Sequence, residues 1–91
     1  MHGEFKTPGG KLVVVDFDVD NERLNNVMVS GDFFLYPEET LERITAALED
    51  MPVASGEDEM LQCLEDAIPD AAALVGFSPD AIVTAVMRGL T

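Results

Sequence analysis

The stretch Val29-Ser30-Gly31-Asp32-Phe33-Phe34-Leu35-Tyr36-Pro37 (VSGDFFLYP) separates a half of the chain that favours strands from a half that favours helices. Because glycine tolerates backbone angles that other residues avoid, we expect Gly31 to let the chain leave a strand. Asp32 is expected to hydrogen-bond nearby backbone N–H groups, as turn-forming side chains do. Phe33 and Phe34 are expected in the core or at an interface, because aromatic side chains supply large buried areas. We therefore interpret Asp32 as a turn residue and not as a catalyst.

Three strands are predicted before this stretch. Residues 2–7 form a short candidate, residues 8–10 (PGG) a turn, and residues 11–18 (KLVVVDFD) a run rich in β-branched side chains. Residues 24–30 form the third strand. Because the connections between these segments are short, the pattern favours an antiparallel meander.

Side-chain alternation divides the residues of the third strand between the two faces of the sheet. Successive residues of a strand point to opposite faces of the sheet. Leu24 and Met28 are therefore assigned to one face, and Val27 and Val29 to the other.

Helices are predicted after the opening stretch. Tyr36-Pro37 is predicted to start the first helix, because Pro37 suits the first helical position, where its missing N–H is not needed. Residues 57–67 repeat apolar side chains at helical spacing, and Ser78-Pro79-Asp80 starts a last helix. Residues 71–75 are interpreted as one helical turn. Strands followed by helices imply a single α+β domain over residues 1–91, in which about three helices pack on one face of a small antiparallel sheet.

The chain is strongly acidic, with 18 acidic residues against 5 basic ones and a net charge of −13. Proteins bind nucleic acids mainly through Lys and Arg that neutralise phosphates, so we expect no nucleic-acid partner. We expect no membrane partner for the same reason, and no segment reaches the length of about 18 apolar residues that spans a bilayer. Without a basic, apolar leader, the protein is expected in the cytoplasm. The acidity fits solubility, a saline cytoplasm or a basic partner surface.

Two motifs resemble ion-binding or phosphate-binding loops but depart from them. Residues 16–21 (DFDVDN) look like the opening of a calcium loop, yet Asn21 and Val27 stand where that loop needs a glycine and a bidentate glutamate. Residues 8–11 (PGGK) lack the spacing of a phosphate-binding loop and lead into a strand. We interpret the first motif as a solvated strand face and the second as a hairpin turn.

The hairpin turn carries a candidate contact with a partner. Lys6 and Lys11 are two of only 5 basic residues, and they bracket the turn formed by Pro8, Gly9 and Gly10. In so acidic a chain, these lysines are candidates to face an anionic ligand held by a partner.

No self-sufficient catalytic set is evident. Cys63 is the single cysteine, and it is expected to be an inert thiol in or near the core. The nearby acidic residues Glu59, Glu65 and Asp66 disfavour its thiolate. His2 is the single histidine, expected at a loose terminus and too isolated for a metal site or a triad. Composition and spacing alone indicate a small acidic α+β domain that serves as a partner module.

A wider pattern runs through residues 2–48. A strand with a basic residue, Lys6, leads into a glycine turn at Gly9-Gly10 and then into a strand of the K-[LI]-x-V type at residues 11–14 (KLVV). A polar turn at Asn21-Glu22 follows, and the next strand runs into Gly31-Asp32-Phe33-Phe34 (G-D-F-F). Residues 76–80 (GFSPD) match a further element before a last helix. In this order the elements resemble the accessory, C-terminal domain of lipoate–protein ligases, over nearly the whole chain.

The resemblance implies a function for a domain that stands alone. In many of these ligases the domain follows a large catalytic domain in the same chain, whereas in split ligases a separate small subunit supplies it. The catalytic subunit would hold the lipoate pocket and the adenylate site, so no catalytic residue, metal or cofactor is expected on this chain alone.

The family's reaction activates lipoate with ATP and Mg²⁺ to lipoyl-adenylate. The lipoyl group is then transferred to a lysine of an acceptor lipoyl domain or of glycine-cleavage H protein. The resemblance implies that the small subunit is needed chiefly for activation, and we hypothesise that Lys6, Lys11 and the Pro8, Gly9 and Gly10 turn face the nucleotide site of the catalytic subunit.

Two other functions remain open. The order of strands followed by helices also resembles sulfur-transfer and iron–sulfur scaffold proteins, which need an exposed reactive cysteine in a loop or three cluster ligands. The acid-flanked Cys63 argues against both. A generic acidic interaction module, with no enzyme attached, is the other alternative.

Overall fold

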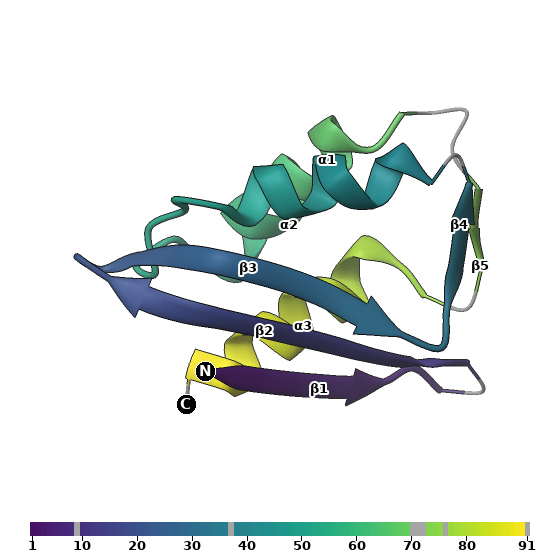
Figure 1. Cartoon of the computed structure of the whole chain (residues 1–91), viewed down its shortest axis with the longest axis horizontal. Helices are drawn as coiled ribbons and strands as arrows, with labels where there is room; N and C mark the ends of the chain where they lie inside the picture. Colours follow the sequence, from purple (N-terminus) through teal and green to yellow (C-terminus); the bar gives the residue numbers. More distant parts are fainter. Residues whose placement is uncertain (9, 37, 70–72, 76, 91) are drawn as a thin grey trace.

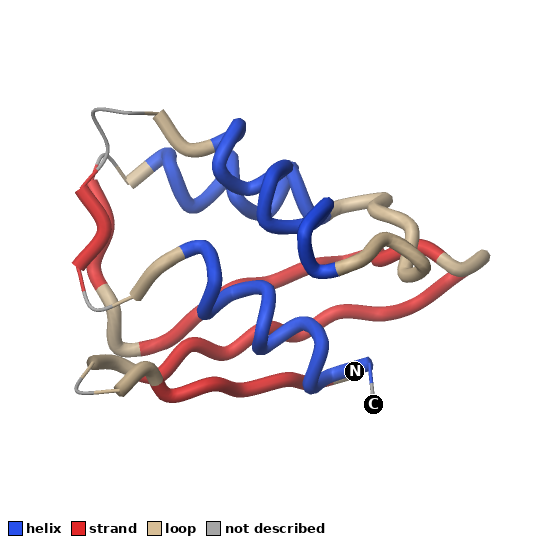
Figure 2. The backbone as a smooth tube through the Cα atoms, turned by 180° about the vertical axis from the view of Figure 1, so that it is seen from behind, coloured by secondary structure: helices blue, strands red, loops and turns tan. Residues whose placement is uncertain are grey.

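The computed structural model describes residues 1–8, 10–36, 38–69, 73–75 and 77–90. This part of the chain folds into five strands and three helices, in the order β1 (His2–Lys6), β2 (Leu12–Asp20), β3 (Arg23–Gly31), β4 (Phe34–Tyr36), α1 (Glu39–Leu48), α2 (Glu57–Ala67), β5 (Ala73–Val75) and α3 (Pro79–Leu90). Helix α3 lies behind the strands in Figure 1 and in front of them in Figure 2, with α1 and α2 on the same side. The α+β architecture expected from the sequence is confirmed.

Strands β1, β2 and β3 form an antiparallel sheet with β2 in the centre, which confirms the predicted meander. Val13, Val15 and Phe17 of β2 are buried and alternate with Val14 and Asp16, which are partly exposed. Val13, Val15 and Phe17 thus form the face of this strand that packs against the helices.

A β-bulge in β3 changes which of its residues are buried. Asp16 pairs with Met28 and Asp18 with Asn25, so two residues of β3 lie opposite one residue of β2. Asn26, in the bulge, has a φ of 54°. The extra residue shifts the alternation, so Leu24 and Val27 share the buried face and Met28 is 63% exposed. The sequence assignment of Leu24 and Met28 to one face was therefore wrong.

Two of the helices begin and end, or begin, where the sequence predicted. α2 spans residues 57–67 as expected, and α3 begins at Pro79 after Ser78, whose carbonyl accepts hydrogen bonds from Ala81 and Ile82. The core joins β2 and β3 to all three helices through Val13, Val15, Phe17, Leu24, Val27, Val29, Ile44, Leu48, Met51, Met60, Leu64, Phe77, Ala81, Ile82, Val83, Ala85 and Val86.

A second, two-stranded sheet joins the middle of the chain to its last third. β4 and β5 lie side by side (Figure 1) and pair antiparallel. Leu35 pairs with Leu74. The helical turn predicted over residues 71–75 was wrong for Ala73–Val75, because pairing with the distant β4 decides the conformation of this segment. The predicted helix start was also wrong for Tyr36, which ends β4, while Pro37 lies outside the described residues.

The amino terminus is held in the fold. Backbone hydrogen bonds link Met1 and Phe17 in both directions, and β1 pairs with β2 from His2 to Lys6. Gly3 lies so close to α3 that a Cβ at this position would be 1.7 Å from the carbonyl oxygen of Ala85. The expectation of a loose terminus around His2 was therefore wrong, because the missing side chain of Gly3 allows α3 to approach β1.

Candidate partner-binding surface

The hairpin between β1 and β2 presents two lysines. The N–H and the hydroxyl of Thr7 each lie 3.2 Å from the Lys11 carbonyl oxygen that accepts their hydrogen bonds, and the Gly10 N–H donates to the Thr7 carbonyl at 2.9 Å. Lys6 and Lys11 are exposed, and neither forms an ion pair within the described residues. The structure thus leaves both ammonium groups available to a partner.

The remaining residues of this turn are only partly described. Pro8 is exposed and Gly10 half-buried, whereas Gly9 lies outside the described residues. The hairpin points toward the end of the molecule where β4 and β5 lie (Figure 1).

The Gly31-Asp32 turn lies against the start of β2, beside this hairpin. Gly31 has a φ of 149°, and a Cβ there would lie 2.1 Å from the Leu12 carbonyl oxygen. The Asp32 N–H donates to that same oxygen at 3.2 Å. The Asp32 side chain is exposed, and its carboxylate makes no hydrogen bond within the described part of the chain. The expectation that the Asp32 side chain would bond nearby backbone N–H groups was therefore wrong, because the backbone fixes this turn.

The two phenylalanines after the turn belong to different contacts. The Phe33 ring packs on the ring of Phe77, with 4.2 Å between centroids and 36° between the planes. Phe34 pairs through its backbone with Val75, and the packing expected of its side chain stays a prediction. Phe33 thus ties the turn to the segment that leads into α3.

A groove lies between β3 and α1, and the sequence did not single it out. It has a volume of about 740 Å³ and continues into a second hollow of about 430 Å³ that shares Val29, Leu41 and Glu42. Glu38 and Glu39 also line the first part and are exposed. In the sequence these acids fit a helix N-terminus equally well, so they carried no signal of a groove.

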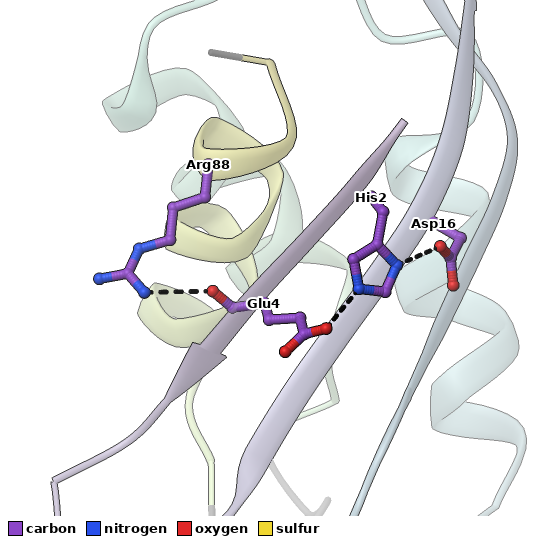
Figure 3. Close-up of polar contacts among 4 residues, drawn as sticks. All are labelled: His2, Glu4, Asp16 and Arg88. Carbon is purple, nitrogen blue, oxygen red and sulfur yellow. Dashed lines mark hydrogen bonds and ion pairs between the residues drawn. The ribbon is translucent and has the colours of Figure 1, made fainter.

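His2 is held between two carboxylates on the face of the sheet away from the helices. Its Nδ1 lies 2.5 Å from Asp16 Oδ1, and its Nε2 lies 2.5 Å from Glu4 Oε2 (Figure 3). The hydrogen bond with Glu4, followed by that with Asp16, raises the pKa of His2 above its ordinary value of 6.5. Because both ring nitrogens are engaged, the imidazole acts as a clamp between β1 and β2.

Arg88 completes the attachment of β1 to α3. Its guanidinium donates to the Glu4 carbonyl oxygen at 3.2 Å (Figure 3). The guanidinium carbon also lies 5.0 Å from the centre of the Phe5 ring. These contacts join β1, near one end of the sequence, to α3, near the other.

Cys63 lies on the exposed side of α2. The expectation of a core or near-core thiol was wrong, since Met60 and Leu64 supply the buried face of this helix. Within the described residues, no group of three or more His, Cys, Asp and Glu side chains could hold a metal ion. None of the described helices has the length and apolar character needed to cross a membrane.

Comparison with known proteins shows that the chain is similar in sequence to a ligase subunit. No family model matches the chain. It is 29% identical over 75 residues to lipoate-protein ligase A subunit 2 of Thermoplasma acidophilum, an alignment that covers 82% of this chain and 76% of the relative.

A solved structure supports the same fold. It comes from a study of an archaeal lipoylation system, a bipartite lipoate protein ligase and its E2 lipoyl domain from Thermoplasma acidophilum. The two chains superpose with a TM-score of 0.69 at 23% identity, covering 94% of this chain and 97% of the other. The resemblance stated from the sequence is thus confirmed: the chain is similar in sequence to the second subunit of a lipoate–protein ligase and shares its fold with a chain from a bipartite ligase system.

Proposed function

We propose that this chain is the non-catalytic, accessory subunit of a two-subunit lipoate–protein ligase. The observation that carries the proposal is the sequence similarity to subunit 2 of such a ligase, which spans most of both chains. The common fold along nearly the full length of the chain supports it. In this role the chain forms a heterodimer with the catalytic subunit in the cytoplasm, and it has no partner among nucleic acids or membranes.

The catalytic subunit is proposed to hold lipoate, ATP and Mg²⁺, whereas the small subunit supports activation. Formation of lipoyl-adenylate separates pyrophosphate, and the mixed anhydride that results hydrolyses if water enters. A docked domain can order the loops of the active site and exclude water. This gives a physical reason for a subunit that supplies no catalytic group of its own.

The lysine hairpin is proposed to face the nucleotide site of the catalytic subunit. Lys6 and Lys11 are exposed and form no ion pair in the described structure, so docking would not require an existing pair to break. Two ammonium groups near a triphosphate would stabilise its charge as the pyrophosphate separates. The acceptor of the lipoyl group is a lipoyl domain or glycine-cleavage H protein.

Reconstitution tests the proposed function. The chain, the large subunit from the same organism, lipoate, ATP and Mg²⁺ are mixed with an acceptor lipoyl domain, and lipoylation is read from the intact mass of the acceptor. We expect modification only when both subunits are present, and an unrelated acidic protein of similar size serves as the control. If the chain gives no more lipoylation than this control, a generic acidic interaction module becomes the better description.

A further inference from the structure

The outer edge of β3 is closed at its beginning by the loop after α1. β3 is an edge strand of the sheet, so one side of its backbone has no neighbouring strand within the described residues. Leu24 nevertheless exchanges backbone hydrogen bonds with this loop: its N–H donates to Met51 at 2.9 Å, and its carbonyl accepts from Asp50 at 2.7 Å. This part of the edge is therefore unavailable to another chain.

The middle of the same edge is closed by a side chain. The carboxylate of Glu49 accepts hydrogen bonds from the N–H of Asn26 at 2.7 Å and from that of Val27 at 3.1 Å. These are the two residues of the β-bulge, which a regular strand could not pair. The loop at Asp50 and Met51 closes the edge at Leu24, and Glu49 closes it at the bulge, so residues 28–31 are the part of the β3 edge that a partner can reach.

The open part of the edge coincides with the groove beside α1. Val29, Ser30 and Gly31 line the strand side of the 740 Å³ groove. The other lining residues combine apolar side chains with carboxylates, namely Phe33, Leu35, Leu41, Glu38, Glu39 and Glu42. A free strand edge, an apolar floor and a charged rim thus occur together at one place.

The charge of the rim restricts what can enter. Glu38, Glu39 and Glu42 are exposed, and no basic residue lines the groove or its continuation among the described residues. Three carboxylates repel an anionic ligand and favour Lys or Arg. An exposed strand edge binds an extended peptide through main-chain hydrogen bonds, while neighbouring pockets select its side chains.

We propose that residues 28–31 of β3 pair with an extended segment of the catalytic subunit, whose basic side chains meet Glu38, Glu39 and Glu42. This inference rests on the proposed function, since it names the surface through which that complex forms. The acidic character of the chain then has a specific use at this groove, in addition to solubility.

Charge reversal tests the rim. The groove variant carries Glu38→Lys, Glu39→Lys and Glu42→Lys. The control variant carries the same charge reversal at the start of α2, Glu57→Lys, Asp58→Lys and Glu59→Lys. Both sets change the net charge equally and lie at a helix N-terminus, so their effects on the helix dipole are comparable. Affinity for the large subunit is measured by calorimetry at low and high salt.

The groove variant is expected to bind about tenfold more weakly at low salt, the size expected from three exposed ion pairs, and the control close to wild type. The difference should shrink at high salt. Equal affinities of the two variants, with both folded by circular dichroism, would overturn the proposal.

Hydrogen exchange on the wild-type protein gives a second readout that needs no variant. In the complex, amide exchange within residues 28–31 should slow relative to the free chain. A formed complex without this protection overturns the proposed surface and leaves the accessory function standing. Protection that appears without the large subunit indicates a second copy of this chain in the groove and also overturns it. If the wild-type chain neither binds nor stimulates the large subunit, the proposed function itself fails.

Discussion

Two residues of β3 with positive φ angles set the course of the strand. Asn26, at 54°, makes the bulge that turns Val27 into the core, and Gly31, at 149°, lets the chain leave β3 beside Leu12. Asparagine tolerates its angle because a short polar side chain fits there, whereas a Cβ at Gly31 would overlap the Leu12 carbonyl oxygen. At both positions the positive φ angle limits which residue types the backbone accommodates.

His2 should titrate above its ordinary pKa of 6.5, because Glu4 and Asp16 stabilise the imidazolium. A group whose pKa is raised in the folded state contributes stability below its unfolded pKa. That contribution is lost as the pH rises through the folded pKa. Stability is therefore expected to fall as the pH rises above about 6.5. As His2 is the single histidine, one NMR titration measures its pKa directly.

Carboxylate removal provides the matched comparison for this titration. Glu4→Gln should lower the pKa of His2, and Asp16→Asn should do so as well. Asp20→Asn, at an exposed position of the same sheet, should leave it unchanged. A His2 pKa at or below 6.5 in the wild-type protein would show that the clamp does not form in solution.

Cys63 separates the ligase function from sulfur chemistry. Since it is exposed, a thiol reagent should label it in the folded protein whatever its function. Cys63→Ser is expected to leave stimulation of lipoylation at the wild-type level, because the accessory role uses no thiol. Loss of stimulation by a folded Cys63→Ser protein would favour the sulfur-transfer alternative.

At the scale of elements, prediction from the sequence succeeded where local pattern decides the structure. Alternation in β2, apolar spacing in α2 and the Ser78-Pro79 start of α3 all gave the observed elements. It failed at β5, whose conformation depends on pairing with β4 far away along the chain. The bulge at Asn26 was not predicted for a related reason. A polar residue within a strand does not indicate that two residues of this strand lie opposite one residue of its neighbour.

The surface was less accessible to sequence reasoning than the fold. The lysines of the hairpin were proposed from charge alone, because basic residues are rare in this chain, and their role stays a prediction. The groove beside α1 needs the relative placement of β3 and the helix, which no local pattern encodes. The His2 clamp likewise joins residues of two strands through their register.

The contact between β1 and α3 predicts a sharp difference between two glycines. Gly3→Ala should lower the free energy of unfolding by about 1–3 kcal/mol or more, since the new methyl group would overlap the Ala85 carbonyl. Gly56→Ala, where nothing lies within 4 Å of the added Cβ, should cost less than about 1 kcal/mol. Urea denaturation of both proteins measures the difference, and equal stabilities would contradict the close packing of β1 on α3.

At the scale of the whole molecule, charge divides the surface that the proposed complex uses. The β1–β2 hairpin offers Lys6 and Lys11, whereas the groove beside α1 offers Glu38, Glu39 and Glu42. Gly31 lies between them, since it contacts Leu12 at the base of the hairpin and also lines the groove. One partner can therefore meet both, with opposite charges at the two places.

The hairpin lysines yield a prediction for catalysis. The double variant Lys6→Ala and Lys11→Ala should slow lipoyl-adenylate formation about tenfold or more at saturating large subunit, because it removes positive charge beside the nucleotide. Arg43→Ala, which removes an exposed charge from α1, is the control and should retain the wild-type rate. A wild-type rate for the double variant would place the hairpin away from the nucleotide site.

The accessory role in activation is tested most directly by measuring lipoyl-adenylate itself. The large subunit is incubated with lipoate, ATP and Mg²⁺, with and without this chain, and the adenylate is quantified by chromatography. The proposal predicts that lipoyl-adenylate accumulates only when both proteins are present. It also predicts that the large subunit alone transfers the lipoyl group from preformed lipoyl-adenylate to an acceptor domain. Adenylate formation by the large subunit alone, at the rate seen with both proteins, would contradict it.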